Sequence, residues 1–304
     1  MTRATVSAHP LLPFLSVTAG IATFSTMDAL MKSASIEAGV YNALLFRAGI
    51  GTLLMTPVWL LAKGRWPTLA ALRIHALRSA VVAAMALLFF WGLVRLPMAE
   101  GMALSFISPL VALYLAAVLL GETIRPAAIL ASLFGLAGVA VIAGARFGDD
   151  GGLGQAGPGI LAVLLSAVFY AWNLILQRQQ AQIARPVDVA LFQNVFIGLI
   201  LVLAAPWLAV VPSAIALRDV TGAAVLAAIA LMLLSWGYAR AEAQALVPLE
   251  YTAFVWAALM GWLWFDEAVT PATVAGTVLI VIGCWIATRE KAPAVPAASL
   301  PPAP

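Results

Sequence analysis

The segment Trp91-Gly92-Leu93-Val94-Arg95 recurs 145 residues later as Trp236-Gly237-Tyr238-Ala239-Arg240. The same offset relates Phe24, Asp28, Glu122, Pro126 and Gly138 to Phe169, Asn173, Glu267, Pro271 and Gly283. With one inserted residue, Ala-Leu-Leu-Phe-Arg at 43–47 resembles Val-Ala-Leu-Phe-Gln at 189–193. One offset that holds along most of a chain indicates a duplicated structural unit. The sequence therefore predicts two similar halves.

The composition indicates that the two halves lie in a lipid bilayer. Of the 304 residues, 64% are hydrophobic and 10% are charged, whereas a soluble domain is about half apolar and a quarter charged. This excludes a soluble enzyme, a disordered protein and a nucleic-acid binder. Ten apolar segments approach the length of about 20 residues that a membrane-spanning helix needs. They are 11–33, 40–61, 74–94, 98–120, 126–144, 159–179, 187–210, 220–240, 249–265 and 271–288.

The basic residues predict the orientation of these ten spans. With a cytoplasmic N-terminus, eleven basic residues fall on the inside, namely Arg3, Lys63, Arg65, Arg73, Arg78, Arg125, Arg178, Arg185, Arg240, Arg289 and Lys291. Three fall on the outside, namely Arg95, Arg146 and Arg218. By the positive-inside rule, both termini are cytoplasmic, as in a multi-pass protein of a bacterial-type inner membrane.

Five spans per half is an odd number, so the second half enters the membrane from the opposite side. The predicted fold is therefore all-α and integral to the membrane, with ten transmembrane helices forming two inverted five-helix repeats. The repeats cover 1–146 and 159–291, with a linker at 147–158 and a disordered tail at 292–304. Inverted repeats are typical of secondary transporters that work by alternating access. The alternative is that the duplication only built a stable bundle.

Four short motifs resemble the drug/metabolite transporter superfamily, and within it the ten-helix EamA branch. They are Lys32, Phe46-Arg47, Ser108-Pro109 and Gly121-Glu122. The resemblance implies a central cavity lined by helices 1–4 and 6–9. It also implies export of amino acids, including aromatic ones, and of related small metabolites. An importer or a drug or cation exporter of the same fold is the alternative, and a membrane-embedded enzyme or a scaffold is a more distant one.

Polar residues within the spans are the candidate site, because they are costly to place in lipid. Asp28 and Lys32 share a face of the first span, and Arg47 lies in the second. Asp28 is expected to pair with Lys32 or with Arg47. The three form a gate or ion-pair network, a site for the charged ends of a substrate, or a fixed structural pair. Gln193 occupies the position of Arg47 in the second half.

A matching stripe on the sixth span contains Tyr170 and Asn173, which either line the cavity or bond neighbouring helices. Trp172, Tyr251 and Trp256 are further substrate-binding candidates. Ser108 is another, because the adjacent Pro109 can free a backbone carbonyl toward the cavity. Trp91 and Trp236 lie near span ends and serve either the membrane interface or a gate.

The acidic residues near span starts have simpler interpretations. Glu122 and Glu267 precede prolines and are interpreted as helix-start residues, and Glu250 as a helix-start residue or a proton-linked acid. Small residues such as Ala131 and Gly276 allow close helix packing, within the fold or in a weak homodimer. The sequence contains no catalytic constellation, metal site or cofactor motif. The expected partners are a small-molecule substrate and the bilayer.

Overall fold

A computed structural model describes residues 11–120, 126–149, 154, 156–181, 183–240, 246 and 249–289. The described residues form helices joined by short connections and contain no strand. The helices are α1 (Leu12–Ala38), α2 (Val40–Leu61), α3 (Leu69–Leu93), α4 (Met98–Ser105), α5 (Ser108–Leu120), α6 (Pro126–Asp149), α7 (Ala156–Ala181), α8 (Pro186–Val202), α9 (Ala205–Leu208), α10 (Ala214–Tyr238), α12 (Ala253–Phe265) and α13 (Pro271–Arg289).

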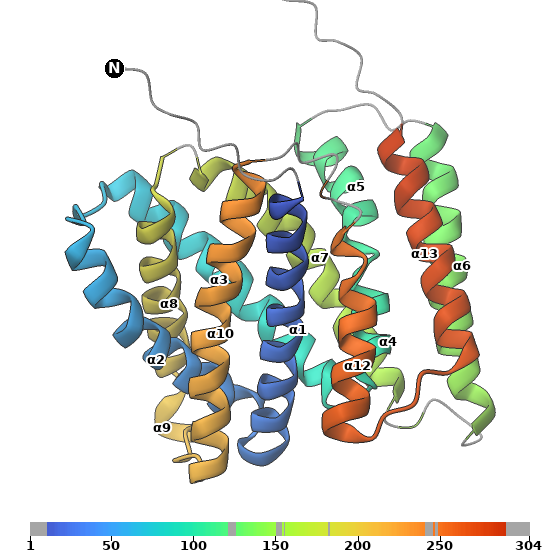
Figure 1. The fold of residues 1–304 in the computed structure, drawn as a ribbon, viewed down its shortest axis with the longest axis horizontal. Helices are drawn as coiled ribbons and strands as arrows, with labels where there is room; N and C mark the ends of the chain where they lie inside the picture. The colour runs from blue at the N-terminus through green and yellow to red at the C-terminus, as the bar shows by residue number, and fades with distance from the viewer. Residues whose placement is uncertain are drawn as a thin grey trace, which may run out of the picture.

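The helices correspond to the predicted membrane spans. Five of them are long and apolar enough to cross a membrane by length and composition, and five shorter apolar helices accompany them. In Figure 1, α1 begins and α13 ends at the same edge of the bundle, which we call the terminal edge. The opposite edge, where α1 ends, is the far edge. Because α1 and α7 run in opposite directions between these edges, the two halves are inverted.

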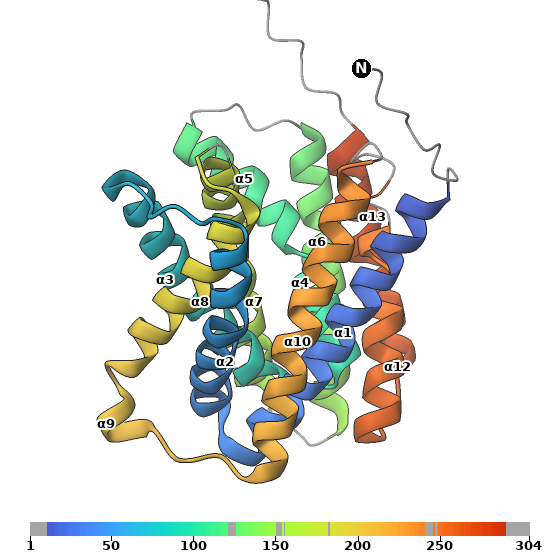
Figure 2. The same cartoon turned by 60° about the vertical axis from the view of Figure 1, so that its left-hand side comes forward.

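Packing between the halves follows an approximate two-fold relation. α1 packs along α10, and the equivalent helices α7 and α3 pack along each other. α2 packs on α8 and α6 on α13, so each of these two pairs joins a helix to its equivalent in the other repeat, and α4 packs on α12 of the other repeat. Figure 2 shows α1 and α10 side by side from a second direction, with α2 next to α8. The bundle is therefore held together mainly by contacts between the two repeats.

The repeated Trp-Gly segment has the same structural role in both halves. A Cβ atom at Gly92 would come within 2.7 Å of the Gly159 carbonyl oxygen on α7. A Cβ atom at Gly237 would come within 3.0 Å of the Pro13 carbonyl oxygen on α1. Each glycine thus allows the close approach that an inter-repeat helix pair requires.

The aromatic and basic residues of the same segment also repeat a contact. The guanidinium carbon of Arg95 lies 3.4 Å from the centre of the Trp91 ring, and that of Arg240 lies 4.2 Å from the Trp236 ring. Each arginine donates a hydrogen bond to the carbonyl oxygen of its tryptophan. Cation–π stacking of this kind covers the ring at a helix end.

The small residues of α6 and α13 pack against each other within the chain. A Cβ atom at Gly138 would lie 2.5 Å from the Gly276 carbonyl oxygen, and one at Gly276 would lie 2.6 Å from the Gly138 carbonyl oxygen. The two backbones are therefore in direct contact. Of the two uses that the sequence left open for these residues, the structure shows the intramolecular one.

The fourth predicted span is interrupted between α4 and α5. Pro109 has no N–H to donate to the carbonyl oxygen of Ser105, which lies four residues earlier. The Ser108 hydroxyl donates to that carbonyl oxygen instead, at 2.6 Å. The Phe106 carbonyl oxygen accepts the Cys284 thiol at 3.1 Å. The break is thus satisfied internally, and the Ser105 carbonyl does not lack a partner.

Three predicted boundaries need correction. α3 begins at Leu69 and not at residue 74, and Arg78, which was counted with the cytoplasmic basic residues, is buried within this helix. The seventh span ends at Val202, after which α9 and an extended segment follow. α6 and α7 reach into both ends of the predicted linker 147–158. The centre of that linker, Glu122 and the predicted tail 292–304 lie outside the described residues.

Candidate functional site

A cluster around Lys32 joins three parts of the bundle at the far edge. The ammonium group of Lys32, which is 3% exposed, donates to the Glu267 carboxylate that follows α12. It also donates to the Leu96 carbonyl oxygen at 2.7 Å. The second carboxylate oxygen of Glu267 accepts the Met98 N–H at 2.7 Å, at the start of α4. We call Lys32, Glu267 and their two backbone partners the far-edge latch.

The latch corrects two sequence predictions. Lys32 pairs with Glu267 of the other repeat, and not with Asp28 on its own helix. Glu267 is therefore more than a helix-start residue. Glu100 on α4 interacts electrostatically with Lys32 and accepts the Thr273 hydroxyl at 3.2 Å. The buried Lys32 ammonium is thus close to two carboxylates and bonded to the Leu96 carbonyl oxygen, and such pairing is what a buried charge requires.

A hollow of about 370 Å³ lies beside the latch and opens to the outside of the molecule. Its lining includes Lys32 and Glu267, together with Ile36, Arg95 and Phe265. The latch therefore forms one wall of this hollow.

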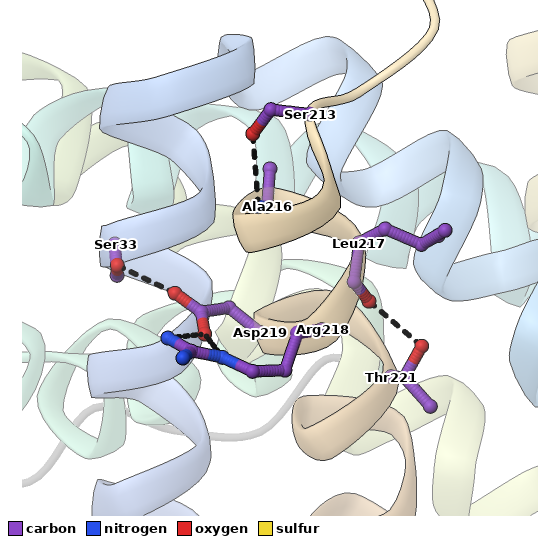
Figure 3. Close-up of polar contacts among 7 residues, drawn as sticks. All are labelled: Ser33, Ser213, Ala216, Leu217, Arg218, Asp219 and Thr221. Atoms are coloured by element: carbon purple, nitrogen blue, oxygen red, sulfur yellow. Dashed lines mark hydrogen bonds and ion pairs between the residues drawn. The ribbon is translucent and has the colours of Figure 1, made fainter.

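A second polar contact ties α1 to α10 near the same edge. The Ser33 hydroxyl donates to the buried Asp219 carboxylate at 2.7 Å, and Arg218 donates to the other carboxylate oxygen at 2.8 Å (Figure 3). The Arg218 side chain is mostly exposed, and exposed ion pairs contribute little stability. The buried Ser33–Asp219 hydrogen bond therefore accounts for most of the stabilisation at this contact. It reinforces the inter-repeat pair at the edge that carries the latch.

The corresponding pair α3 and α7 carries a different cluster toward the terminal edge. The buried guanidinium of Arg78 donates through Nε to the Asn173 side-chain oxygen at 2.9 Å. It donates through Nη1 to the Gln180 side-chain oxygen, and the Gln177 oxygen lies 3.5 Å from Nη2. The Gln180 amide nitrogen lies 2.6 Å from Nδ1 of His75. Amide side chains, and not carboxylates, surround this cation.

Asp28 and Arg47 form the third polar group, within the bundle between α1 and α2. The two side chains are half-buried and interact electrostatically. Among the described residues, Nε of Arg47 and the hydroxyl of Ser25 are buried and have no hydrogen-bond partner. Buried hydrogen-bonding groups without partners are suited to bind a polar ligand.

The Tyr170 side chain faces the Arg78 cluster and an accessible space. It is 41% exposed, although Ser166 and Asn173 on the same face of α7 are buried. Its hydroxyl interacts electrostatically with Arg78 and with Glu250, whose carboxylate accepts the Tyr238 hydroxyl. Two tyrosine hydroxyls and one carboxylate, all from the second repeat, thus lie close together near the terminal edge.

The remaining predicted residues are dispersed. Trp172 is 37% exposed on α7, where the apolar side chains of Leu161, Leu165 and Val168 are more exposed, and its role in a cavity stays a prediction. Tyr251 packs edge-to-face on Phe106, with 5.3 Å between the ring centres.

Three other predicted residues also lie apart from the polar groups. Trp256 packs beside Val17 and Leu246. The Ser108 hydroxyl proton is used at the helix break. Gln193 is half-buried on α8.

Comparisons with known families and with solved structures agree with this fold. The EamA-like transporter family matches residues 11–144 and again residues 157–289. The chain belongs to this family. The two matches correspond to the two inverted repeats, so the chain is a multi-pass membrane protein with the family's duplicated architecture.

Several relatives of this EamA protein are exporters by name. The pseudopaline exporter CntI of Pseudomonas aeruginosa, in two strains, is 27% identical over 277 residues, covering 88% of this chain and 93% of the relative. The aromatic amino acid exporter YddG of Ancylobacter novellus is 35% identical over 95 residues, covering 31% of this chain and 33% of the relative. A crystal structure with 24% identity superposes with a TM-score of 0.61, covering 91% of this chain and 96% of that one, which supports the fold.

Proposed function

We propose that this EamA protein is a secondary transporter that exports amino acids, including aromatic ones, and related small metabolites by alternating access. The observation that carries the proposal is that inverted repeats meet through chemically different clusters at opposite edges. The far edge is closed by the Lys32–Glu267 ion pair, and the terminal edge by Arg78 with amide side chains. Two closures that can open separately are what alternating access requires.

The membrane orientation follows from the charge distribution. The terminal edge faces the cytoplasm of a bacterial-type inner membrane, and the far edge faces outward. In this orientation, the far-edge latch closes the outer gate. Tyr170, whose residue is 41% exposed, and Glu250 then lie toward the cytoplasmic side, where a substrate for export would enter.

The Asp28–Arg47 pair is the proposed binding site for the charged ends of a zwitterion. Arg47 offers an unpaired buried N–H to a carboxylate, and Asp28 offers a carboxylate to an ammonium group. A substrate that bound both groups would replace their mutual interaction at little electrostatic cost. The few charges elsewhere in the described interior favour broad specificity for the rest of the substrate.

The direction and the substrate class draw support from the relatives. Proteins named as exporters of pseudopaline and of aromatic amino acids match this chain, the first over most of its length. Export of related compounds is therefore favoured over import or cation export by the same fold. The family match also favours transport over membrane-embedded catalysis.

Proteoliposomes provide the test. Purified protein is reconstituted in both orientations, and uptake of radiolabelled amino acids is measured, with aromatic, aliphatic, acidic and basic members. We expect saturable uptake of several zwitterions that Asp28→Asn and Arg47→Gln each reduce about tenfold, which corresponds to one lost charge-assisted hydrogen bond. The control is Glu37→Gln, which removes an acidic side chain at the end of α1 that is not part of the proposed binding site. Equal uptake by all four proteins would contradict the assignment of Asp28 and Arg47.

A further inference from the structure

A second pocket, of about 260 Å³, lies at the terminal edge between the α2–α3 connection and the α7–α8 connection. It is lined by Arg65, Trp66, Pro67, Thr68, Ala71, His75, Ile183, Ala184, Arg185 and Asp188. The pocket therefore joins the two repeats. Its ionisable groups are Arg65, His75, Arg185 and Asp188, which makes it basic overall.

Two of these groups are already paired with each other. Arg185 donates two hydrogen bonds to Asp188, at 2.8 and 3.0 Å, and Trp59 donates a third at 2.8 Å. Hydrogen bonding to Asp188 raises the pKa of Arg185. Both side chains therefore stay charged, and the pair as a whole has no net charge. The positive charge of Arg65 has no such partner among the described residues, and its side chain is exposed. Arg65 is therefore free to bind an anion.

His75 adds a fixed hydrogen-bond donor to the pocket wall. Because the Gln180 oxygen accepts from Arg78, the Gln180 nitrogen donates to Nδ1 of His75, at 2.6 Å. This places the imidazole proton on Nε2. The His75 side chain is fully buried, and its Nε2 has no partner among the described residues. A buried donor of this kind calls for an acceptor.

The inverted repeat supplies an internal comparison. Residues 65–68, Arg-Trp-Pro-Thr, correspond to residues 210–213, Val-Val-Pro-Ser, and both serine and threonine cap the following helix. Position 75 corresponds to Val220, and Arg185 to Gly39. The same backbone arrangement thus exists at the far edge without the basic residues, so the fold does not need them.

We infer that this pocket binds the phosphate of an anionic phospholipid headgroup from the adjacent leaflet. Arg65 and Nε2 of His75 supply the donors, and the exposed apolar side chains of Trp66 and Ile183 in its lining contact the acyl chains. Basic pockets between membrane helices on the cytoplasmic side suit such headgroups. The bound lipid bridges the two repeats and stabilises the closed terminal edge.

The test compares lipids on the intact purified protein. Native mass spectrometry measures how much phosphatidylglycerol and phosphatidylcholine stay bound after release from nanodiscs that contain both. We expect preferential retention of phosphatidylglycerol, and Arg65→Gln should reduce this preference about tenfold, as expected for one lost charge-assisted bond. The control, Arg73→Gln, removes another exposed positive charge, which lies at the start of α3 and outside the pocket.

His75→Phe is the second variant, because phenylalanine keeps the ring that packs 5.4 Å from Phe192. It should reduce the preference in the same direction. Equal effects of the Arg65 and Arg73 variants would overturn the site in favour of general charge attraction. Inorganic phosphate is added to the protein in phosphatidylcholine discs, and its effect on the melting temperature is compared with that of phosphatidylglycerol. Equal stabilisation by the two would overturn the lipid assignment. Neither result depends on transport, so the proposed function is tested separately.

Discussion

Breaking the far-edge latch should shift the protein toward the state that is open at that edge. In Glu267→Gln, the Lys32 ammonium keeps its bond to the Leu96 carbonyl but faces a neutral amide in place of a carboxylate. The Met98 N–H likewise loses a charged acceptor. The change is therefore confined to the charge of one buried group, and the side-chain shape is kept.

The magnitude follows from these contacts. A hydrogen bond to a charged group contributes about 1.5–3 kcal/mol, and a neutral one about 1 kcal/mol. Two bonds lose this charge assistance, so the closed far edge is weakened by roughly 1–4 kcal/mol. The open population should rise roughly 5- to 1,000-fold if it is small in the unmodified protein.

The assay is labelling of a cysteine at position 25, in a protein whose Cys284 is replaced by alanine. Ser25 lies on α1 two turns before Lys32, is 1% exposed, and has no hydrogen-bond partner among the described residues. In intact cells, a membrane-impermeant maleimide should label this cysteine faster in Glu267→Gln. The control is Glu250→Gln, which removes an acid near the opposite edge. The double variant Lys32→Glu/Glu267→Lys should restore slow labelling. Unchanged labelling in Glu267→Gln would refute the gating role of the latch.

Three further predictions concern the packing that positions the site. Gly92→Ala should lower the free energy of unfolding by about 1–3 kcal/mol because of the 2.7 Å approach to the Gly159 carbonyl oxygen, whereas Gly144→Ala, with open space around it, should not; thermal unfolding of the purified proteins compares them. Arg78→Gln should lower the melting temperature more than Arg73→Gln, because it leaves the Asn173 and Gln180 oxygens buried without their donor, and equal melting temperatures would contradict the assigned cluster. Ser108→Ala should lower the free energy of unfolding by about 1–3 kcal/mol, because the Ser105 carbonyl oxygen then lacks a donor. Ser132→Ala, at a second serine within a helix, is the comparison. A stability equal to that of the unmodified protein would show that water replaces the Ser108 hydroxyl.

The architecture could be predicted from the sequence because membrane spans and repeats leave one-dimensional signals. The segment at Trp91 and its copy at Trp236 gave the repeat, and the structure shows why each retains its glycine. The break at Pro109 was also predictable from proline chemistry. The satisfied carbonyl at Ser105 was not, because the compensating bond comes from a side chain whose direction depends on the break itself.

The partners within the candidate site were harder to predict. Lys32 was identified as a costly buried charge, but its partner Glu267 lies 235 residues away and has the ordinary features of a helix-start acid. Arg78, near the start of the predicted span 74–94, was counted with the cytoplasmic basic residues because charge near a span end is usually solvated. A signal was available in the repeat, since Lys32 and Glu267 match Gln177 and Glu122 at one offset. Residues that keep a shared offset in both halves are candidates for contact across the two-fold axis.

The most direct test of the central claim is solute counterflow. Proteoliposomes loaded with a high concentration of an unlabelled amino acid are diluted into buffer that contains a trace of the same labelled compound. A carrier that alternates between two faces should accumulate label transiently above equilibrium, with several zwitterions and without ATP. We predict this overshoot for the unmodified protein and its loss in Asp28→Asn. The absence of any overshoot across the amino-acid panel, in liposomes whose protein retains its cooperative thermal unfolding, would contradict the account.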